Sequence, residues 1–237
     1  MNFTGTAGWS VPRAVAKNFP GTGTHLQRYA QVLNGVEINS SFYRAHAVST
    51  YQRWADSTPS TFRFAVKVPR AITHKAGLRC AREDLQQFLT EVNGLGNRLG
   101  PLLIQLPPSM KFDAKVVSHF LRMLRDLYQG TAVCEPRHKS WFEQPAESLL
   151  IGHNISRVAA DPPVAATGEK PGGDTQLVYY RLHGSPRTYW SGYSQERLIA
   201  WVNEIRLHGN KTVWIIFDNT AAGYATSNAL QMRELLK

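Results

Sequence analysis

The stretch VEINSSFYR, residues Val36–Arg44, decides the fold prediction, because it reads as a strand that ends in polar and aromatic side chains. Successive side chains of a strand point to opposite faces, so Glu37 and Asn39 share one face and the flanking aliphatic residues share the other. The aliphatic neighbours predict that Glu37 is buried, and a buried carboxylate requires partners. We therefore expect other strands to supply those partners.

Strand and helix patterns alternate on both sides of this stretch. Further strands are expected at Phe3–Ser10, Phe62–Lys67, Gly100–Leu106, Thr131–Glu135, Ile155–Asp161, Leu177–Leu182 and Thr212–Phe217. Apolar residues at helical spacing predict helices between most of them, with Thr24, Asp113 and Ser194 as N-caps. Eight strands in this alternation predict an α/β fold, a single TIM-like (β/α)8 barrel.

One segment departs from the alternation. Residues 162–174, between the sixth and seventh expected strands, are rich in Pro and Gly and show no helical periodicity. We expect the helix at this point to be reduced or missing. The sequence shows no internal repeat or linker, so residues 1–237 are expected to form one domain.

The composition narrows the class of protein. Hydrophobic residues make up 43% of the 237 residues, but no apolar run is long enough to span a bilayer and no secretory signal is recognisable. We expect a soluble cytoplasmic protein without a membrane partner, in which Cys80 and Cys134 are free thiols. The excess of 27 Lys and Arg over 17 Asp and Glu, a net charge of +10, favours anionic partners.

Several longer motifs occur along the chain: GTAGW from Gly5, LGPLLIQLPPSM from Leu99, DPP from Asp161, YYRLHGS from Tyr179 and FDNTAAGYATSNA from Phe217. Together with VEINSSFYR they resemble the YecE-like family, the domain of unknown function numbered 72, nearly from end to end. The resemblance implies a barrel of parallel strands and helices and implies no particular reaction. Asp218 departs from the family pattern, which has an amide there in an Asn-Asn-Thr motif, so no role is carried over to it.

Active sites of such barrels lie at the carboxyl ends of the strands. The polar residues at or just beyond the expected strand ends are Glu37, Asn39, Lys67, Gln105, Glu135, Arg137, Asp161, Arg181, His183, Asp218 and Asn219. We assign acid–base catalysis to Glu37, Glu135 and His183, because imidazole titrates near neutrality and two close carboxylates can share a proton. The others, with Tyr43 and Thr220, are assigned to substrate binding. The alternative is a closed ion-pair network that only stabilises this end of the barrel.

The loops after the last two strands suggest an anion site. They read HGSPR at His183–Arg187 and DNTAAG at Asp218–Gly223, and such loops commonly bind phosphate in these barrels. Asn219 or Thr220 is expected to cap the last helix, whose first N–H groups attract anions. Ordinary capping without a ligand is the alternative. No histidine or carboxylate spacing is diagnostic of a metal site, so neither a metal nor a cofactor is predicted.

Basic and aromatic residues are interleaved in the same loops. The basic ones are Lys67, Arg70, His74, Lys75, Arg79, Arg137, His138, Lys139 and Arg187, and the aromatic ones are Trp9, Phe42, Tyr43, Trp141, Tyr189, Trp190 and Tyr193. The sequence therefore favours an enzyme acting on a small anionic substrate, phosphorylated or carbohydrate-like. A nucleic-acid-binding or processing protein that uses a basic, aromatic rim is an alternative, and a non-catalytic ligand-binding protein is a third.

Overall fold

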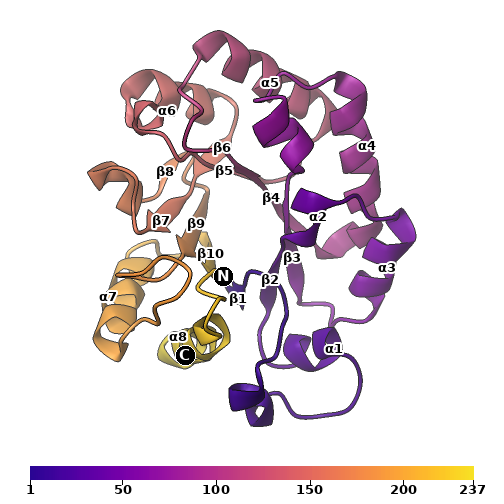
Figure 1. Cartoon of the computed structure of the whole chain (residues 1–237), viewed down its shortest axis with the longest axis vertical. Coiled ribbons are helices and arrows are strands. Elements are labelled where there is room, and N and C mark those ends of the chain that lie inside the picture. Colours follow the sequence, from indigo (N-terminus) through magenta and orange to yellow (C-terminus); the bar gives the residue numbers. More distant parts are fainter.

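The computed structural model describes residues 1–237 and contains two β-sheets with helices packed against them (Figure 1). The strands are β1 Asn2–Thr6, β2 Gly35–Ile38, β3 Arg63–Lys67, β4 Leu99–Gln105, β5 Ala132–Glu135, β6 Ile155–Arg157, β7 Ala159–Asp161, β8 Gly172–Gly173, β9 Leu177–Leu182 and β10 Thr212–Phe217.

Helices connect most of these strands. The α-helices are α1 His25–Ala30, α2 Ser40–Tyr43, α3 Val48–Asp56, α4 Arg82–Val92, α5 Ala114–Leu127, α6 Gln144–Gly152, α7 Gln195–Arg206 and α8 Tyr224–Leu235. Shorter helical turns are η1 Arg13–Asn18, the π-helical η2 Ala71–Lys75, η3 Asn93–Arg98, η4 Lys139–Phe142 and η5 Ala166–Glu169. None of the helices combines the length and the apolar character that crossing a membrane requires.

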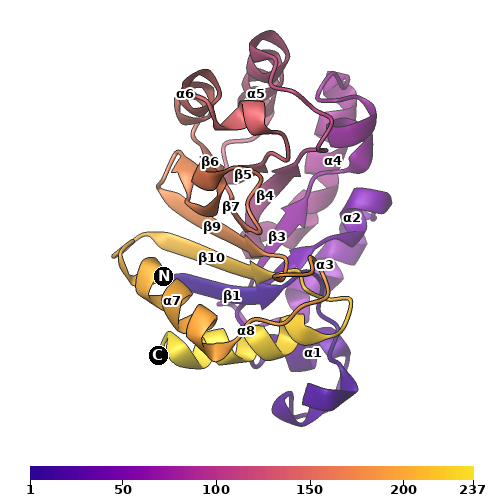
Figure 2. The ribbon, with the colours of Figure 1, turned by 60° about the vertical axis from the view of Figure 1, so that its left-hand side comes forward.

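The strands are almost all parallel. One sheet has the order β1-β10-β9-β7, and the other has the order β2-β3-β4-β5-β6-β8, in which only β8 is antiparallel to its neighbour. Figure 2 shows β9, β10 and β1 side by side, with α7 and α8 along one side of them. The expected α/β alternation is confirmed, and it brings the carboxyl ends of the parallel strands to the same edge of each sheet.

Three expected N-caps are confirmed. Thr24 forms a reciprocal capping box with Gln27, and the side chains of Asp113 and Ser194 accept hydrogen bonds from the first turns of α5 and α7. These caps satisfy N–H groups that would otherwise lack partners at the helix starts. Capping residues therefore determine where three of the helices begin.

The expected strand Ile155–Asp161 is in fact two strands that belong to different sheets. Residues of β6 pair with β5, whereas β7 pairs with β9. Val158 lies between them, and its N–H donates to the carbonyl of Cys134 at 2.9 Å. The sequence predicted extended backbone here, but it carried no sign that the segment changes partner strands.

The reduced helix after this segment is confirmed. Between β7 and β9 the chain forms only the four-residue turn η5 and the two-residue strand β8. Prolines and glycines in residues 162–173 disfavour a helix there, because proline lacks the donor and glycine loses more backbone entropy on ordering.

Buried apolar side chains form two clusters. The larger one, of 49 residues, includes Val36 and Ile38 and lies between the strands and the helices. The smaller one contains Phe3, Ala65, Leu103, Val133, Val158, Leu177, Tyr179, Trp214 and Ile216, which come from both sheets. The inner faces of the two sheets therefore meet around this second cluster, where the Trp214 ring stacks on Phe3 and Tyr179 at centroid distances of 4.8 and 5.9 Å.

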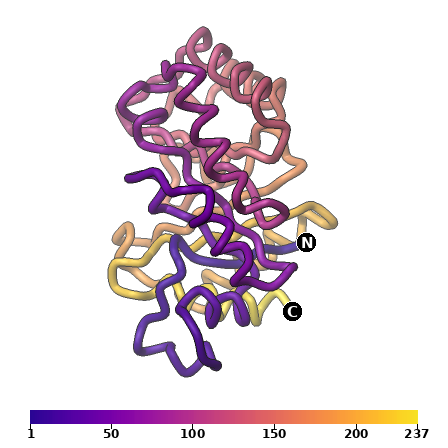
Figure 3. Tube along the Cα trace, turned by 90° about the vertical axis from the view of Figure 1, so that its right-hand side faces the viewer, coloured from indigo at the N-terminus to yellow at the C-terminus, as the bar shows by residue number.

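The two sheets also approach each other at β1 and β2. Ala7 and Glu37 form a parallel bridge, in which Gly8 donates its N–H to the carbonyl of Glu37 at 2.8 Å. Both chain termini lie on the same side of the molecule (Figure 3). Met1 precedes the start of β1, so the N-terminus lies at the amino end of this strand, away from its carboxyl end.

Gly5 is required at this approach, because a Cβ atom there would collide with the backbone carbonyl of Gly35. We expect Gly5→Ala to destabilise the protein by about 1–3 kcal/mol, as overpacking of a tight core does. Urea unfolding followed by circular dichroism measures this change. Gly152→Ala is the matched control, since no atom lies within 4 Å of the added Cβ and the helical site favours alanine. Equal stabilities of the two variants would contradict this close approach.

Candidate functional site

Along one face of β9, two apolar side chains are followed by two charged ones. Leu177 and Tyr179 belong to the inner apolar cluster, and Arg181 and His183 follow at the same two-residue spacing. Residues two apart on a strand share a face, so Arg181 and His183 point into the same interior. Both side chains are 1% exposed. The same step from apolar to charged occurs on other strands, from Ala65 to Lys67, Val133 to Glu135 and Ile216 to Asp218.

Arg181 is the centre of the cluster that results. Its guanidinium donates to both oxygens of Glu37, at 3.0 Å from Nε and 2.7 Å from Nη2. Nη1 donates to Glu135 at 2.5 Å, and Nη2 also donates to Asp218 at 3.0 Å. One cation therefore holds three carboxylates that come from three different strand ends.

His183 lies between two of these carboxylates. Its Nδ1 is 3.0 Å from Asp218 Oδ2, and its Nε2 is 2.9 Å from Glu135 Oε1. Arg137 Nη2 also lies 3.1 Å from Nε2. A proton on either ring nitrogen therefore has a carboxylate oxygen as its acceptor.

The cations keep the acidic groups ionised. Burial opposes the charge of Glu135, but Arg181 and Arg137 outweigh it and hold the pKa of Glu135 well below its usual range. Burial likewise opposes the charge of Asp218, yet Arg181 and the hydrogen bond from His183 lower its pKa. Both carboxylates are consequently anions at neutral pH.

Among the residues of the cluster whose pKa is shifted, Lys67 has the pKa nearest to 7. Burial lowers its pKa to about 8, and the charge of Arg181 acts in the same direction, against the carboxylates of the cluster. Its Nζ lies 4.1 Å from the centroid of the Phe42 ring. At pH 8 about half of this amine is neutral and able to accept a proton.

The lowered pKa of Lys67 is directly testable. We expect its acylation by a small anhydride to rise with pH around a midpoint near 8, because only the neutral amine reacts. Mass spectrometry of tryptic peptides after brief labelling gives the extent at each pH. Exposed Lys115 on α5 is the control within the chain, and its labelling is measured at the same pH values. A Lys67 profile that coincides with that of Lys115 would contradict the lowered pKa.

The cluster has an exposed side and a buried side. The side chains of Asp218 and Arg137 are 14% and 19% exposed, whereas Glu37 is 0% exposed. Tyr189 lies with its ring at right angles to that of His183, at a centroid distance of 5.6 Å. A molecule approaching from solvent therefore meets Asp218, Arg137 and Lys67 first.

Glu37 and Glu135 do not lie side by side as the expected proton-transfer pair. The Arg181 guanidinium stands between them and bonds to both. Glu37 Oε2 also accepts a hydrogen bond from the Tyr179 hydroxyl at 2.9 Å. The sequence did not single out Tyr179, although its place two residues before Arg181 on one strand face is the signal that could have found it.

Four other residues expected in the site have different surroundings. Gln105 donates to the carbonyl of Leu106, and the buried Asn39 Oδ1 has no hydrogen-bond partner. Tyr43 is 78% exposed. Asp161 accepts from Tyr193 at 2.6 Å and from Arg197 at 3.3 Å, so its carboxylate ties β7 to the segment leading into α7.

The expected capping of the last helix by Asn219 or Thr220 is wrong. Helix α8 begins at Tyr224 after Gly223, with no side-chain cap. The Asn219 amide instead donates to the carbonyl of Ser191 and to Asn228, and Thr220 is exposed.

Other donors of the expected anion site are also engaged. The Gly184 N–H donates to the Tyr193 hydroxyl at 2.9 Å, and Arg181 is surrounded by carboxylates. The side chains that can receive an anion at the strand ends are therefore Lys67 and the partly exposed Arg137. The structure contains no group of three or more His, Cys, Asp and Glu side chains arranged to hold a metal ion.

Only part of the expected aromatic rim is accessible. Tyr43, Tyr189 and Trp190 are 78%, 41% and 46% exposed, and the Arg187 guanidinium stacks on Trp190 at 4.5 Å. Trp141 and Tyr193 are buried instead. Their apolar surface is used in packing, so they offer no stacking face to a ligand.

Relatives of the chain have similar sequences and structures. The UPF0759 protein YunF of Bacillus subtilis (strain 168) is 25% identical over 268 residues, which cover 100% of this chain and 95% of the relative. The UPF0759 protein YecE of Escherichia coli (strain K12) is 30% identical over 156 residues, which cover 65% of this chain and 55% of the relative.

Crystal structures of two DUF72 family proteins are similar to this fold. The protein from Thermotoga maritima MSB8 has a TM-score of 0.80 and 27% identity, with 100% of this chain and 99% of that chain covered. The protein from Enterococcus faecalis V583 has a TM-score of 0.83 and 21% identity, with 100% and 95% covered. The family described as "Protein of unknown function DUF72" matches residues 3–237, and the chain therefore belongs to the DUF72 family.

Proposed function

We propose that this protein is an enzyme that binds a small anionic substrate, phosphorylated or carbohydrate-like, at the carboxyl ends of the strands and moves a proton on it. The observation that carries the proposal is the position of His183, whose two ring nitrogens contact Asp218 and Glu135 within hydrogen-bond distance. Groups poised to exchange protons at strand ends are typical of active sites in parallel α/β enzymes.

The geometry supports different roles within this cluster. Lys67 and Arg137 attract the anionic group, and the neutral fraction of Lys67 accepts the proton from the substrate. His183, which Asp218 orients through Nδ1, returns a proton to the substrate. Glu37, which is fully engaged and 0% exposed, acts as a positioning residue that orients Arg181.

We also infer that the two sheets form one TIM-like (β/α)8 barrel and that residues 1–237 form one domain. The two sheets are connected at two places, and both connections support this inference. At one of them Ala7 and Glu37 form a bridge between the sheets, and at the other the chain passes without a break from β6 in one sheet to β7 in the other. The inner cluster of side chains from both sheets fills the interior of such a barrel.

Deuterium exchange tests the proposed reaction even though the substrate is unidentified. The protein is incubated in D2O with a panel of sugar phosphates and sugar acids, and proton NMR follows the loss of carbon-bound hydrogen. We expect exchange or conversion of at least one compound. Binding of a compound without exchange would instead support a non-catalytic ligand-binding protein, and neither binding nor exchange across the panel would overturn the proposal.

The exposed aromatic and basic rim supports nucleic-acid binding as a second candidate function. Tyr43, Trp190 and the Arg187–Trp190 stack are accessible to bases, and Lys75 and Arg79 are exposed cations on the connection after β3. Bases stack on such side chains while cations meet the phosphates.

Salt dependence checks this second candidate. We expect the double variant Lys75→Ala, Arg79→Ala to bind single-stranded DNA more weakly and with a smaller dependence on salt, by about 0.7 in the log–log slope for each phosphate that is no longer neutralised. Fluorescence anisotropy between low and physiological salt measures this slope. Arg233→Ala on α8 is the control. An unchanged slope in the double variant would exclude the connection after β3 as the DNA-binding surface.

A further inference from the structure

Lys67 is a cation of the strand-end cluster that pairs with no carboxylate. All three carboxylates of the cluster form ion pairs with Arg181, and none forms one with Lys67. The Nζ atom forms no hydrogen bond with the protein, and it is not one of the fully buried polar atoms that lack a partner, so part of the amine is open to solvent. Lysines beside buried carboxylates are ordinarily paired, and this one therefore offers a free amino group.

Helix α2 covers another part of this amine. Nζ lies 4.1 Å from the centroid of the Phe42 ring, and Phe42 is 8% exposed. The Ser41 hydroxyl of the same helix donates to the backbone carbonyl of Lys67 at 2.7 Å, which holds the end of β3 against α2. The ring replaces water around Nζ, and the strand end fixes the position of the side chain.

Two features of these surroundings activate a lysine as a nucleophile. Burial and the neighbouring guanidinium of Arg181 both disfavour the ammonium form of Lys67 and lower its pKa to about 8. Desolvation and an adjacent cation are the means by which lysines that attack carbonyl groups are activated. The neutral amine has a lone pair that no group of the protein engages.

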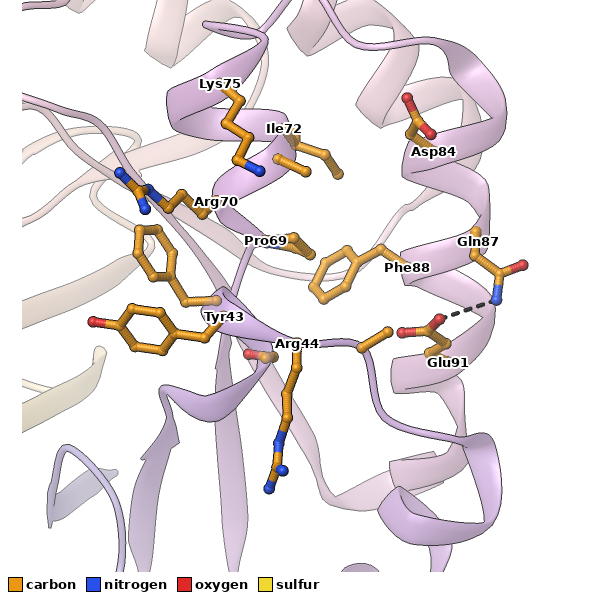
Figure 4. Close-up of a pocket in the computed structure, with 14 residues that line it drawn as sticks. Tyr43, Arg44, Pro69, Arg70, Ile72, Lys75, Asp84, Gln87, Phe88 and Glu91 are labelled. Atoms are coloured by element: carbon orange, nitrogen blue, oxygen red, sulfur yellow. Dashed lines mark hydrogen bonds between the residues drawn. The ribbon is translucent and has the colours of Figure 1, made fainter.

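Two arginines that can hold an anionic group lie in the same region. The His74 ring contacts Phe42 at a centroid distance of 4.9 Å, and burial lowers its pKa, which the charge of Lys67 lowers further. The charges of Arg70 and Arg137 act in the same direction, so both arginines lie within electrostatic range of this ring. Arg70 is exposed and forms no ion pair, and Figure 4 shows its side chain pointing away from α4. A small molecule held by these arginines is therefore bound close to the free amine.

We propose that Lys67 is a nucleophile that forms an imine with the carbonyl group of a small aldehyde or ketone, and that this compound carries a phosphate or carboxylate held by Arg137 and Arg70. This inference rests on the proposed function, since it uses the same site. For a carbonyl compound it makes Lys67 the group that bonds to the substrate, in place of the proton acceptor.

Imine formation releases one water molecule. Nζ of the neutral amine bonds to the carbonyl carbon, one amine hydrogen and one proton from His183 leave with the carbonyl oxygen as water, and a protonated imine remains. The electron pair of an adjacent C–H bond then moves towards the imine nitrogen, while the proton of that bond passes to His183. The imine therefore accounts for the exchange of a carbon-bound hydrogen with solvent.

Trapping with sodium borohydride tests the proposal, because hydride adds to the imine carbon and leaves a stable secondary amine on the lysine. The protein is incubated with dihydroxyacetone phosphate, glyceraldehyde 3-phosphate or pyruvate and then reduced, and mass spectrometry of its peptides locates the product. We expect at least one compound to modify Lys67 at least about tenfold more than exposed Lys115. Glycerol 3-phosphate, which has no carbonyl group, should give no product. Dihydroxyacetone, which has no anionic group, should modify Lys67 at least about tenfold less than its phosphate does.

Variants and deuterium exchange separate this inference from the proposed function. The mass added to the intact protein should disappear in Lys67→Met and stay unchanged in the control Lys115→Met, with circular dichroism showing that both variants are folded. Exchange of a compound without a product on Lys67 would overturn this inference and leave the proposed proton transfer in place. A product on Lys67 without exchange would support the imine and contradict the proton transfer. Modification of Lys67 no greater than that of Lys115 with all three compounds would overturn the inference.

Discussion

Replacing Arg181 by methionine should lower the free energy of unfolding by at least about 3–5 kcal/mol at pH 7, a large part of the stability of an ordinary domain. The guanidinium is 1% exposed and bonds to three carboxylates, so its loss leaves buried negative charges without their common partner. Urea unfolding monitored by tryptophan fluorescence measures the change. Arg82→Met is the control, because its pair with Asp126 spans 3.5 Å between largely exposed side chains and should contribute less than about 1 kcal/mol.

The pH dependence of this destabilisation has a definite sign. In the wild type the lowered pKa values of Glu135 and Asp218 stabilise the fold above their unfolded values, and this stabilisation is lost as the pH falls through the folded values. Without Arg181, burial raises the pKa of the same carboxylates, so the variant loses stability as the pH rises. The difference between wild type and variant should therefore shrink between pH 7 and pH 4. A loss below about 1 kcal/mol at pH 7 would show that Arg181 is not the organising charge.

Lys67→Met should lower the rate of proton exchange on the substrate by about 10²–10⁴-fold, the usual contribution of a general acid or base. The compound that the wild type exchanges in D2O supplies the assay, and the wild-type rate should rise with pH around the Lys67 pKa of about 8. Replacement of Lys115 by methionine is the control and should leave the rate unchanged.

The stability of Lys67→Met separates a catalytic role from a structural one. Because the folded pKa of about 8 lies below the ordinary lysine value of 10.5, protonation of Lys67 opposes folding at pH 7. Methionine removes this cost, so the variant should be at least as stable as the wild type. Exchange at the wild-type rate in a folded Lys67→Met variant would remove Lys67 from the mechanism.

The sequence predicted most of the strand-end cluster, because strand alternation is a local rule. Glu135, Arg181 and Asp218 follow apolar residues of their strands at two-residue spacing, Glu37 lies between Val36 and Ile38, and the structure brings the four charged residues together. The rule says which face a side chain lies on, but it gives no partner. It therefore could not show that Arg181 stands between Glu37 and Glu135, since that depends on how distant strands pack.

The incorrect predictions arose for the same reason, because the sequence does not show which residues a side chain or strand will pair with. The division of the segment 155–161 between two sheets depends on which neighbours its residues pair with, and Asn219 failed as a cap because Ser191 and Asn228 already engage its amide.

The most direct test of the proposed substrate site is a crystal structure of the protein soaked with inorganic phosphate, compared with crystals of Lys67→Met treated in the same way. We predict density for an anion within hydrogen-bond distance of Lys67 Nζ and Arg137, next to His183, and its absence from the variant. Phosphate found only at other places, or equally occupied in Lys67→Met, would contradict the claim that these strand ends bind an anionic substrate.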